Sequence, residues 1–226
     1  MKILHCFADQ GVESETLLDY GEVIRVSINA EDTNGSTPIK ADANNLPFSD
    51  DVEFDLGLLQ PPCTKWSTMP DTKRDEAPNL IPRAREIGKQ YCKDYIIENK
   101  PQAPLQDPVR LSGPMFNLPI EYERGFETSF KVEQPRQQQR LSETSPYFYN
   151  NRTKEWWQSV KGCSGNYLRE HIAKNSIPEA YLRYLLQHYA KSLEFDGDRD
   201  QYTDYDKQLA TRKGKFENQE LSHYQA

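Results

Sequence analysis

The chain of 226 residues is long enough for one domain with a substantial core. Its net charge of -7 argues against a dedicated non-specific nucleic-acid binder, although a local basic patch is compatible with an acidic total. No apolar stretch approaches about 18 residues, so no membrane span is expected.

The four cysteines lie far apart and show no CxxC spacing: Cys6, Cys63, Cys92 and Cys163. This spacing argues against a zinc site and against a disulfide framework. The apolar run at residues 1–7 is too short for a signal peptide. We therefore expect a cytoplasmic protein with reduced thiols and no metal.

The first 60 residues predict short strands with one helix between the first two. Ser14 is a candidate cap for that helix, and Gly21 would end it. Strands are expected over residues 2–7, 22–28, 37–40 and 54–60. This order indicates an α/β sheet.

The next 130 residues alternate helical spacing with apolar runs. A buried strand is expected at residues 95–97, and a pair of strands at residues 109–116 and 120–130. Helices are expected over residues 80–95, 153–160 and 179–193. Trp156 and Trp157 favour a packing anchor over a base-stacking platform, because tryptophan is highly buried on average.

Beyond residue 193 the chain becomes acidic and loses its periodicity. We therefore expect a domain at residues 1–193 and a poorly ordered tail at residues 194–226.

The apolar run at residues 54–60 ends in Pro61 and Pro62, and Cys63 follows at once. Two prolines cannot continue a sheet ladder, so the strand ends there. Ligands bind at the carboxyl ends of strands in open α/β sheets, which makes Cys63 a candidate nucleophile. The alternative is a small buried hydrophobic residue.

Two further side chains stand at or near predicted strand ends, Glu98 and Arg124. A thiolate, a carboxylic acid and a guanidinium are sufficient to attack an electron-poor ring. The thiolate would be the nucleophile, the acid would protonate a ring nitrogen, and the arginine would hold a ring carbonyl or lower the thiol pKa. The alternatives are an exposed edge carboxylate for Glu98 and a surface or ion-paired arginine for Arg124.

Two motifs resemble those of cytosine-C5 DNA methyltransferases. Residues 61–63, followed by Ser67, resemble the Pro-Cys catalytic motif of that family. Residues 95–99 read Tyr-Ile-Ile-Glu-Asn and resemble its Glu-Asn-Val strand, with Lys100 in place of valine.

Two more motifs follow in the same order as in the family. Residues 111–118, running on to residues 124–127, are similar to the Leu-Cys-Gly-Ser-Met-Phe-Gly-Leu … Arg-His-Arg-x-Phe-Glu block of short, phage-type members, with one arginine lost. Residues 172–181 resemble the late Gly-Asn-Ser/Ala-Val-Pro motif. Order and spacing agree from about residue 2 to residue 190.

The resemblance implies a Rossmann-like methyltransferase sheet with helices on both faces. It implies that Cys63 attacks C6 of a cytosine flipped out of double-stranded DNA and forms a covalent adduct. Glu98 would protonate or hydrogen-bond N3, Asn99 would orient the strand, and Arg124 would contact O2 or the thiolate. C5 would take a methyl group from S-adenosylmethionine. The loop after Cys63 would close over the base.

The resemblance assigns cofactor contacts to Phe7, Gly11, Asp42, Pro61 and Asn175, with Asp42 receiving the adenine amine. The cofactor loop departs from the family pattern.

The family loop reads Phe-x-Gly-x-Gly, whereas residues 7–11 read Phe-Ala-Asp-Gln-Gly and keep one glycine. The acid expected at the end of the second strand is replaced by Ser27 or Asn29, with Glu31 close by.

Residues 125–171 occupy the place of the family's target-recognition region and form a reduced insert. Candidate phosphate contacts, with a solvated polar face as the alternative, are Lys131, Arg136, Arg140, Arg152, Lys154, Lys161 and Arg169. So short an insert predicts recognition of a few base pairs or borrowed specificity.

The short form further implies a phage or prophage origin, a monomer in the host cytoplasm, and methylation that protects viral DNA from restriction. Two rival functions remain open. One is a degenerate relative that binds DNA or a host protein, and the other is an enzyme that acts on free pyrimidine nucleotides.

Overall fold

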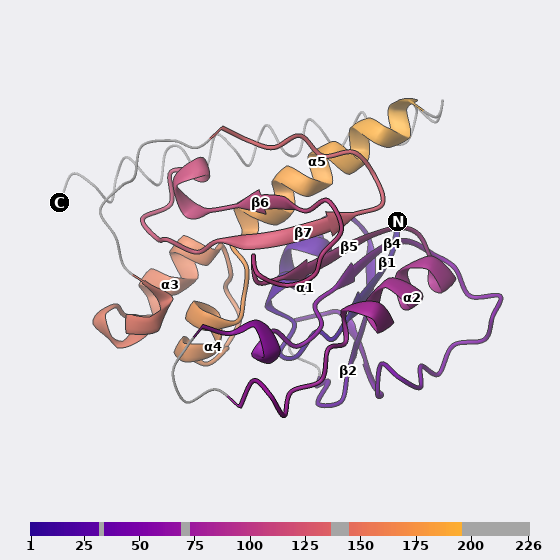
Figure 1. Ribbon diagram of the computed structural model, residues 1–226, viewed down its shortest axis with the longest axis horizontal. Coiled ribbons are helices and arrows are strands. Elements are labelled where there is room, and N and C mark those ends of the chain that lie inside the picture. The colour runs from indigo at the N-terminus through magenta and orange to yellow at the C-terminus, as the bar shows by residue number, and fades with distance from the viewer. Residues whose placement is uncertain (32–33, 69–72, 137–144, 196–226) are drawn as a thin grey trace.

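A computed structural model describes residues 1–31, 34–68, 73–136 and 145–195 of the chain. Its centre is a seven-stranded sheet in the order β3-β2-β1-β4-β5-β7-β6 (Figure 1). Strand β7 runs antiparallel to its neighbours β5 and β6, and the other pairs are parallel. The strands are β1 (Lys2–Cys6), β2 (Glu22–Ser27), β3 (Thr37–Lys40), β4 (Phe54–Leu59), β5 (Cys92–Asn99), β6 (Val109–Leu111) and β7 (Arg124–Thr128).

Helices cover both faces of the sheet (Figure 1). The α-helices are α1 (Val12–Leu17), α2 (Ile81–Tyr91), α3 (Lys154–Lys161), α4 (Arg169–Lys174) and α5 (Glu179–Phe195). Short 3-10 helices are η1 (Thr64–Trp66), η2 (Gly113–Phe116) and η3 (Pro146–Asn151).

Side chains of the central strands alternate between two apolar clusters. Leu58 and Ile96 join the cluster that contains α1, α3, α4 and α5, whereas Leu59 and Ile97 join the cluster that contains α2. All four are fully buried. The sheet is therefore covered on both faces, and the predicted Rossmann-like α/β fold is confirmed.

Most predicted elements are present, but the predicted start of the first helix is wrong. Helix α1 begins at Val12, with Gly11 as its N-cap at φ 73°. Ser14 lies inside the helix, where its hydroxyl is 2.7 Å from the His5 ring.

The predicted end of the second helix is also wrong. Helix α2 ends at Tyr91, and Cys92 takes extended backbone angles as the first residue of β5. The last residues of β5 are buried on both faces. The first four residues of β5 read Cys-Lys-Asp-Tyr and are only partly buried or exposed, so no apolar run marks the start of the strand, and Cys92 still fits the helical spacing of the residues before it.

The predicted strand pair forms as β6 and β7, which are antiparallel and shorter than expected. Residues 113–116, expected in the first strand, form η2 instead. Helix α4 was not predicted, because six residues are too few for a periodic signal.

Helix α5 continues to Phe195, and the rest of the predicted tail, residues 196–226, lies outside the described residues. Among the residues described, no helix has both the length and the apolar character needed to cross a membrane.

Candidate active site

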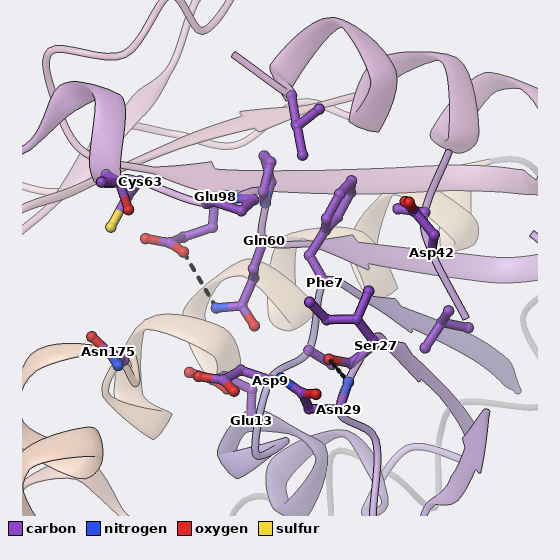
Figure 2. Close-up of a pocket in the computed structure, with 18 of the residues that line it drawn as sticks. Phe7, Asp9, Glu13, Ser27, Asn29, Asp42, Gln60, Cys63, Glu98 and Asn175 are labelled. Atoms are coloured by element: carbon purple, nitrogen blue, oxygen red, sulfur yellow. Dashed lines mark hydrogen bonds between the residues drawn. The ribbon is translucent and has the colours of Figure 1, made fainter. Parts of the chain in front are cut away.

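A pocket of about 510 Å³ opens at the carboxyl ends of β1, β2, β4 and β5 (Figure 2). This is the point where the strand order reverses, between β1 and β4, which is where open α/β sheets bind their ligands. The volume lies in the ordinary range for small-molecule sites, about 300–1,000 Å³.

Cys63 stands at the mouth of this pocket as the N-cap residue of η1. It is half-buried, and Figure 2 shows its thiol facing the same hollow as the Glu98 carboxylate. The Asn99 amide donates a hydrogen bond of 2.8 Å to the carbonyl of Pro61. The end of β5 therefore holds the proline turn that positions the thiol.

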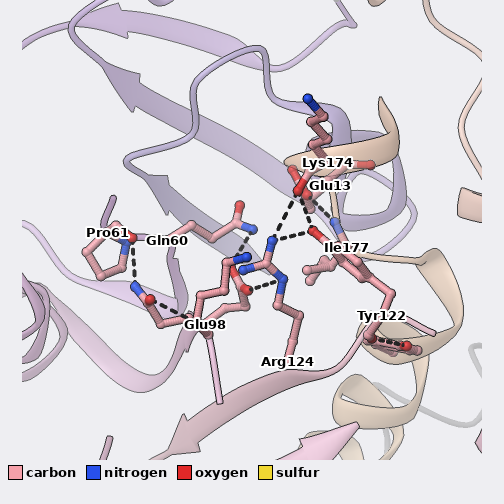
Figure 3. Close-up of polar contacts among 12 residues, drawn as sticks. Glu13, Gln60, Pro61, Glu98, Tyr122, Arg124, Lys174 and Ile177 are labelled. Atoms are coloured by element: carbon pink, nitrogen blue, oxygen red, sulfur yellow. Dashed lines mark hydrogen bonds and ion pairs between the residues drawn. The ribbon is translucent and has the colours of Figure 1, made fainter. Parts of the chain in front are cut away.

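Glu98 and Arg124 form a buried pair at the pocket wall (Figure 3). Arg124 Nε lies 3.4 Å from Glu98 Oε1, yet neither atom makes a hydrogen bond within the described part of the chain. Arg124 also donates to the Tyr122 hydroxyl and, at 3.2 Å, to the Lys174 carbonyl. One carboxylate oxygen and one guanidinium N–H thus remain without a hydrogen-bond partner of their own beside the pocket.

Two cations interact electrostatically with the Cys63 thiol. Burial opposes the charged form of Arg124, but its contacts with Tyr122 and Glu98 outweigh burial and raise its pKa. Lys100 also interacts with Cys63 and Glu98, while burial and Arg124 lower the Lys100 pKa. Positive charge beside a partly exposed thiol is the environment of reactive cysteines.

A buried chain of hydrogen bonds, absent from the sequence prediction, reaches Glu98 from α1. The Gln60 amide donates to Glu98 Oε2 at 3.3 Å, and its oxygen lies 2.7 Å from Nε2 of His5. His5 Nδ1 lies 2.7 Å from the Ser14 hydroxyl. This arrangement places the proton of neutral His5 on Nε2, because the Gln60 oxygen can only accept. Gln60 thereby orients the Glu98 carboxylate.

Burial lowers the pKa of His5 from 6.5 to about 4, and this shift predicts a pH dependence of stability. The unfolded chain binds a proton at His5 below pH 6.5, whereas the folded protein binds it only near pH 4. Stability therefore falls as pH decreases through this window.

The substitution His5→Gln removes that dependence. Relative to the wild type, the unfolding free energy of the variant is expected to rise by about 2 kcal/mol between pH 7 and pH 5. Urea denaturation of both proteins at the two pH values measures the change. If the difference in unfolding free energy between the variant and the wild type is the same at both pH values, the predicted role of His5 is contradicted.

On the other side of the pocket, the loop after β1 is held by Arg25 of β2. Arg25 is fully buried, and it donates to the Asp9 carbonyl at 3.0 Å and to the Glu31 carbonyl. A Cβ atom on Gly11 would lie 2.4 Å from Arg25 Cδ, and Gly11 has φ 73°. The glycine that the loop retains is therefore required by packing and by its left-handed backbone.

The far end of the pocket offers groups that suit an adenosine. Asp42 is exposed there, and its Oδ1 accepts from the backbone N–H of Asn44 at 2.8 Å. Ser27 and Asn29 line the pocket at the end of β2, whereas Glu31 does not line it. Ile28, which the sequence did not single out, lines the pocket with 62% of its surface exposed.

Asp42 thus offers a carboxylate to an amine, and Ser27 and Asn29 offer a hydroxyl and an amide to sugar hydroxyls. Ile28 offers an apolar surface to a planar ring. These residues fit S-adenosylmethionine, with neutral groups in place of the acid expected at β2.

The pocket brings together most of the predicted site residues: Cys63, Glu98, Arg124, Phe7, Asp42, Pro61 and Asn175. Gly11 and Asn99 are not in its lining, and each supports a neighbouring loop instead. Glu13 was missed, because a charged residue in the first turn of a helix reads as solvated. It lines the pocket, burial raises its pKa to about 7, and it accepts from the Ile177 N–H.

The region predicted to contact DNA is only partly at the surface. Lys161 is fully buried, donates to the Ser176 carbonyl and lies over the Tyr122 ring, so its prediction as a phosphate contact is wrong. Arg140 lies outside the described residues. Trp157 is fully buried, as expected of a packing anchor.

Protein-family models give no match to this chain, and neither do curated protein sequences. Among solved structures, the Dnmt2 methyltransferase of S. pombe is similar, with a TM-score of 0.56 and 11% identity over 85% of this chain and 99% of that chain. At this identity the similarity establishes only that the two chains share the same α/β fold.

Two other structures align less closely. The Entamoeba histolytica methyltransferase EhMeth gives a TM-score of 0.49 at 10% identity, over 85% of this chain and 98% of that chain. A protein described as a DNA modification methyltransferase, encoded within an E. coli prophage, gives 0.46 at 15% identity. That alignment covers 63% of this chain, which spans about half, 53%, of the prophage protein.

Proposed function

We propose that the protein methylates C5 of cytosine in DNA, using S-adenosylmethionine. The observation that carries the proposal is the convergence of the Cys63 thiol with the buried pair Glu98 and Arg124 on one pocket. The same pocket continues to Asp42 at its far end, where the residues suit an adenosyl group.

Cys63 is the nucleophile of the proposed reaction. Its thiolate forms a bond to C6 of the cytosine, and the electrons of the C5–C6 double bond move into the ring, which makes C5 nucleophilic. After C5 has been substituted, a water molecule acting as base takes the C5 proton, the electrons of that C–H bond restore the double bond, and the C6–S bond breaks to release the thiolate. The thiol is half-buried at the pocket mouth, which is compatible with a base that enters from outside.

Glu98 and Arg124 stabilise the charge that develops in the ring. Glu98 in its protonated form donates a hydrogen bond, or its proton, from Oε1 to N3, and the Nε–H of Arg124 donates to the O2 carbonyl. Gln60 keeps the second oxygen of Glu98 in place, so that the first can point at the ring.

The cofactor would lie along Phe7, Asp42, Pro61 and Asn175, and when bound it supplies an electrophilic methyl group. Ser27 and Asn29 would face its ribose hydroxyls.

The target base must leave the duplex to reach Cys63, at a cost of about a few kcal/mol. Exposed cations of residues 125–171, among them Lys131 and Arg136, are proposed to contact phosphates.

Covalent trapping tests the proposal. A pool of random-sequence DNA duplexes containing 5-fluorocytosine is incubated with the protein and S-adenosylmethionine, because fluorine at C5 blocks release of the enzyme. We expect a protein–DNA adduct that mass spectrometry places on the peptide containing Cys63, and none with the same pool containing cytosine.

The same reagents separate the rival functions. An adduct with 5-fluorodeoxycytidine monophosphate, but not with the duplex, would replace DNA by a free nucleotide as substrate. Binding of the duplex without any adduct would favour a non-catalytic DNA-binding relative.

A further inference from the structure

The pocket has a third side that the proposed chemistry leaves unused. Cys63 and Glu98 line the side of the base, and Asp42 marks the far end. Figure 2 shows Asp9 and Asn175 along the remaining side, and His171 of α4 also lines the pocket. These three residues offer a carboxylate, an amide and an imidazole.

Asp9 occupies a position where the resembling family has glycine. Its φ of 37° is left-handed, a conformation that aspartate and asparagine adopt more readily than most residues. Its side chain is 59% exposed, and Oδ2 lies 3.3 Å from His171 Nδ1. The His171 side chain is only 9% exposed, so Asp9 contacts a partner that packing holds in place.

His171 Nδ1 has a second partner, because the Asn175 amide lies 3.2 Å from the same atom. A single ring nitrogen either donates to Asp9 or accepts from Asn175, and it does not do both at once. When Nδ1 accepts from Asn175, the Asp9 carboxylate is released without leaving the buried ring unpaired. Asp9 is therefore available to a ligand at small cost.

A cofactor with its adenosine near Asp42 and its reactive sulfur near Cys63 has one part left to place. That part is an α-amino acid, with an ammonium and a carboxylate on one carbon. A zwitterion matches a side of the pocket that carries a carboxylate opposite N–H donors.

We propose that Asp9 and Asn175 bind the amino-acid end of the cofactor, with Asp9 receiving the ammonium and the Asn175 amide donating its second N–H to the carboxylate, while His171 Nδ1 accepts from Asn175 and holds it in place. The inference rests on the proposed function and assigns a role to two residues outside the family motifs. Asp9 then contributes a charged contact where glycine would only allow the backbone to come close.

Calorimetry with two adenosyl ligands tests this assignment without any catalytic turnover. S-adenosylhomocysteine carries the amino-acid end, and 5′-methylthioadenosine lacks it. We expect the wild type to bind S-adenosylhomocysteine at least about tenfold more tightly. Asp9→Asn, which keeps the size and the backbone preference, should weaken S-adenosylhomocysteine about tenfold and leave 5′-methylthioadenosine unchanged.

His171→Gln should show the same selective loss. Asp42→Asn is the matched control, since it should weaken both ligands by a similar factor and keep their ratio. If Asp9→Asn weakens neither ligand or both equally, the amino-acid site is overturned while the cofactor assignment stands. If neither ligand binds the wild type at millimolar concentration, the cofactor assignment itself fails, and the inference falls with it.

Discussion

Replacing Cys63 by serine is expected to lower methyl transfer to DNA by at least about 10⁴-fold, because the hydroxyl is a far weaker nucleophile than the thiolate at neutral pH. The half-buried thiol at the N-cap of η1 tolerates this change of one atom, so the fold should be retained. Transfer of a labelled methyl group from S-adenosylmethionine to a random-sequence duplex pool measures the effect. Binding of S-adenosylhomocysteine should stay unchanged.

Cys163→Ser is the matched control for this variant. Cys163 is also half-buried and unpaired, but burial raises its pKa to about 12, so its thiol is not ionised at neutral pH. Its substitution should leave methyl transfer within about twofold of the wild type. Retained activity in Cys63→Ser would show that another group attacks the base.

Replacing Arg124 by methionine is expected to destabilise the protein by about 3–5 kcal/mol. The substitution leaves the Glu98 carboxylate, only 5% exposed, without its ionic partner. It also removes the donor to the Lys174 carbonyl. Urea denaturation at pH 7 measures the loss, and methyl transfer should fall with it even under conditions where the variant is folded.

The double variant Arg124→Met/Glu98→Gln should recover part of that stability, because a neutral amide replaces the unpaired carboxylate. Arg110→Met is the control. The Arg110 side chain is 57% exposed and lies 3.9 Å from Glu123, so its loss should cost less than about 1 kcal/mol. A double variant no more stable than Arg124→Met would show that the cost does not come from the Glu98 charge.

Much of the site position follows from local sequence. An apolar run that stops at Pro61 and Pro62 has to end a strand, so Cys63 had to stand at a sheet edge. The same reasoning placed Glu98 after the next buried strand. Such predictions succeed because the end of a strand is set by neighbouring residues, here by prolines that cannot donate a backbone hydrogen bond.

Residue environments that depend on distant packing were not predictable in this way. Glu13 and Lys161 read as solvated charges, yet both are buried, because the elements that cover them come from other parts of the chain. The helical spacing before residue 95 extended too far for a related reason. The first residues of β5 read Cys-Lys-Asp-Tyr, without an apolar run, and only pairing with β4 makes them a strand.

The sequence by itself determined an α/β sheet and a thiol, an acid and a guanidinium at or near strand ends. Only the tertiary structure decided how those groups meet. Strands β1, β4 and β5 lie side by side, although about 90 residues separate the first from the last. That order brings His5 to Gln60 and Gln60 to Glu98, and it brings α4 to the loop of Asp9. Contacts between such distant residues are set by the packing of the whole sheet, which no local pattern records.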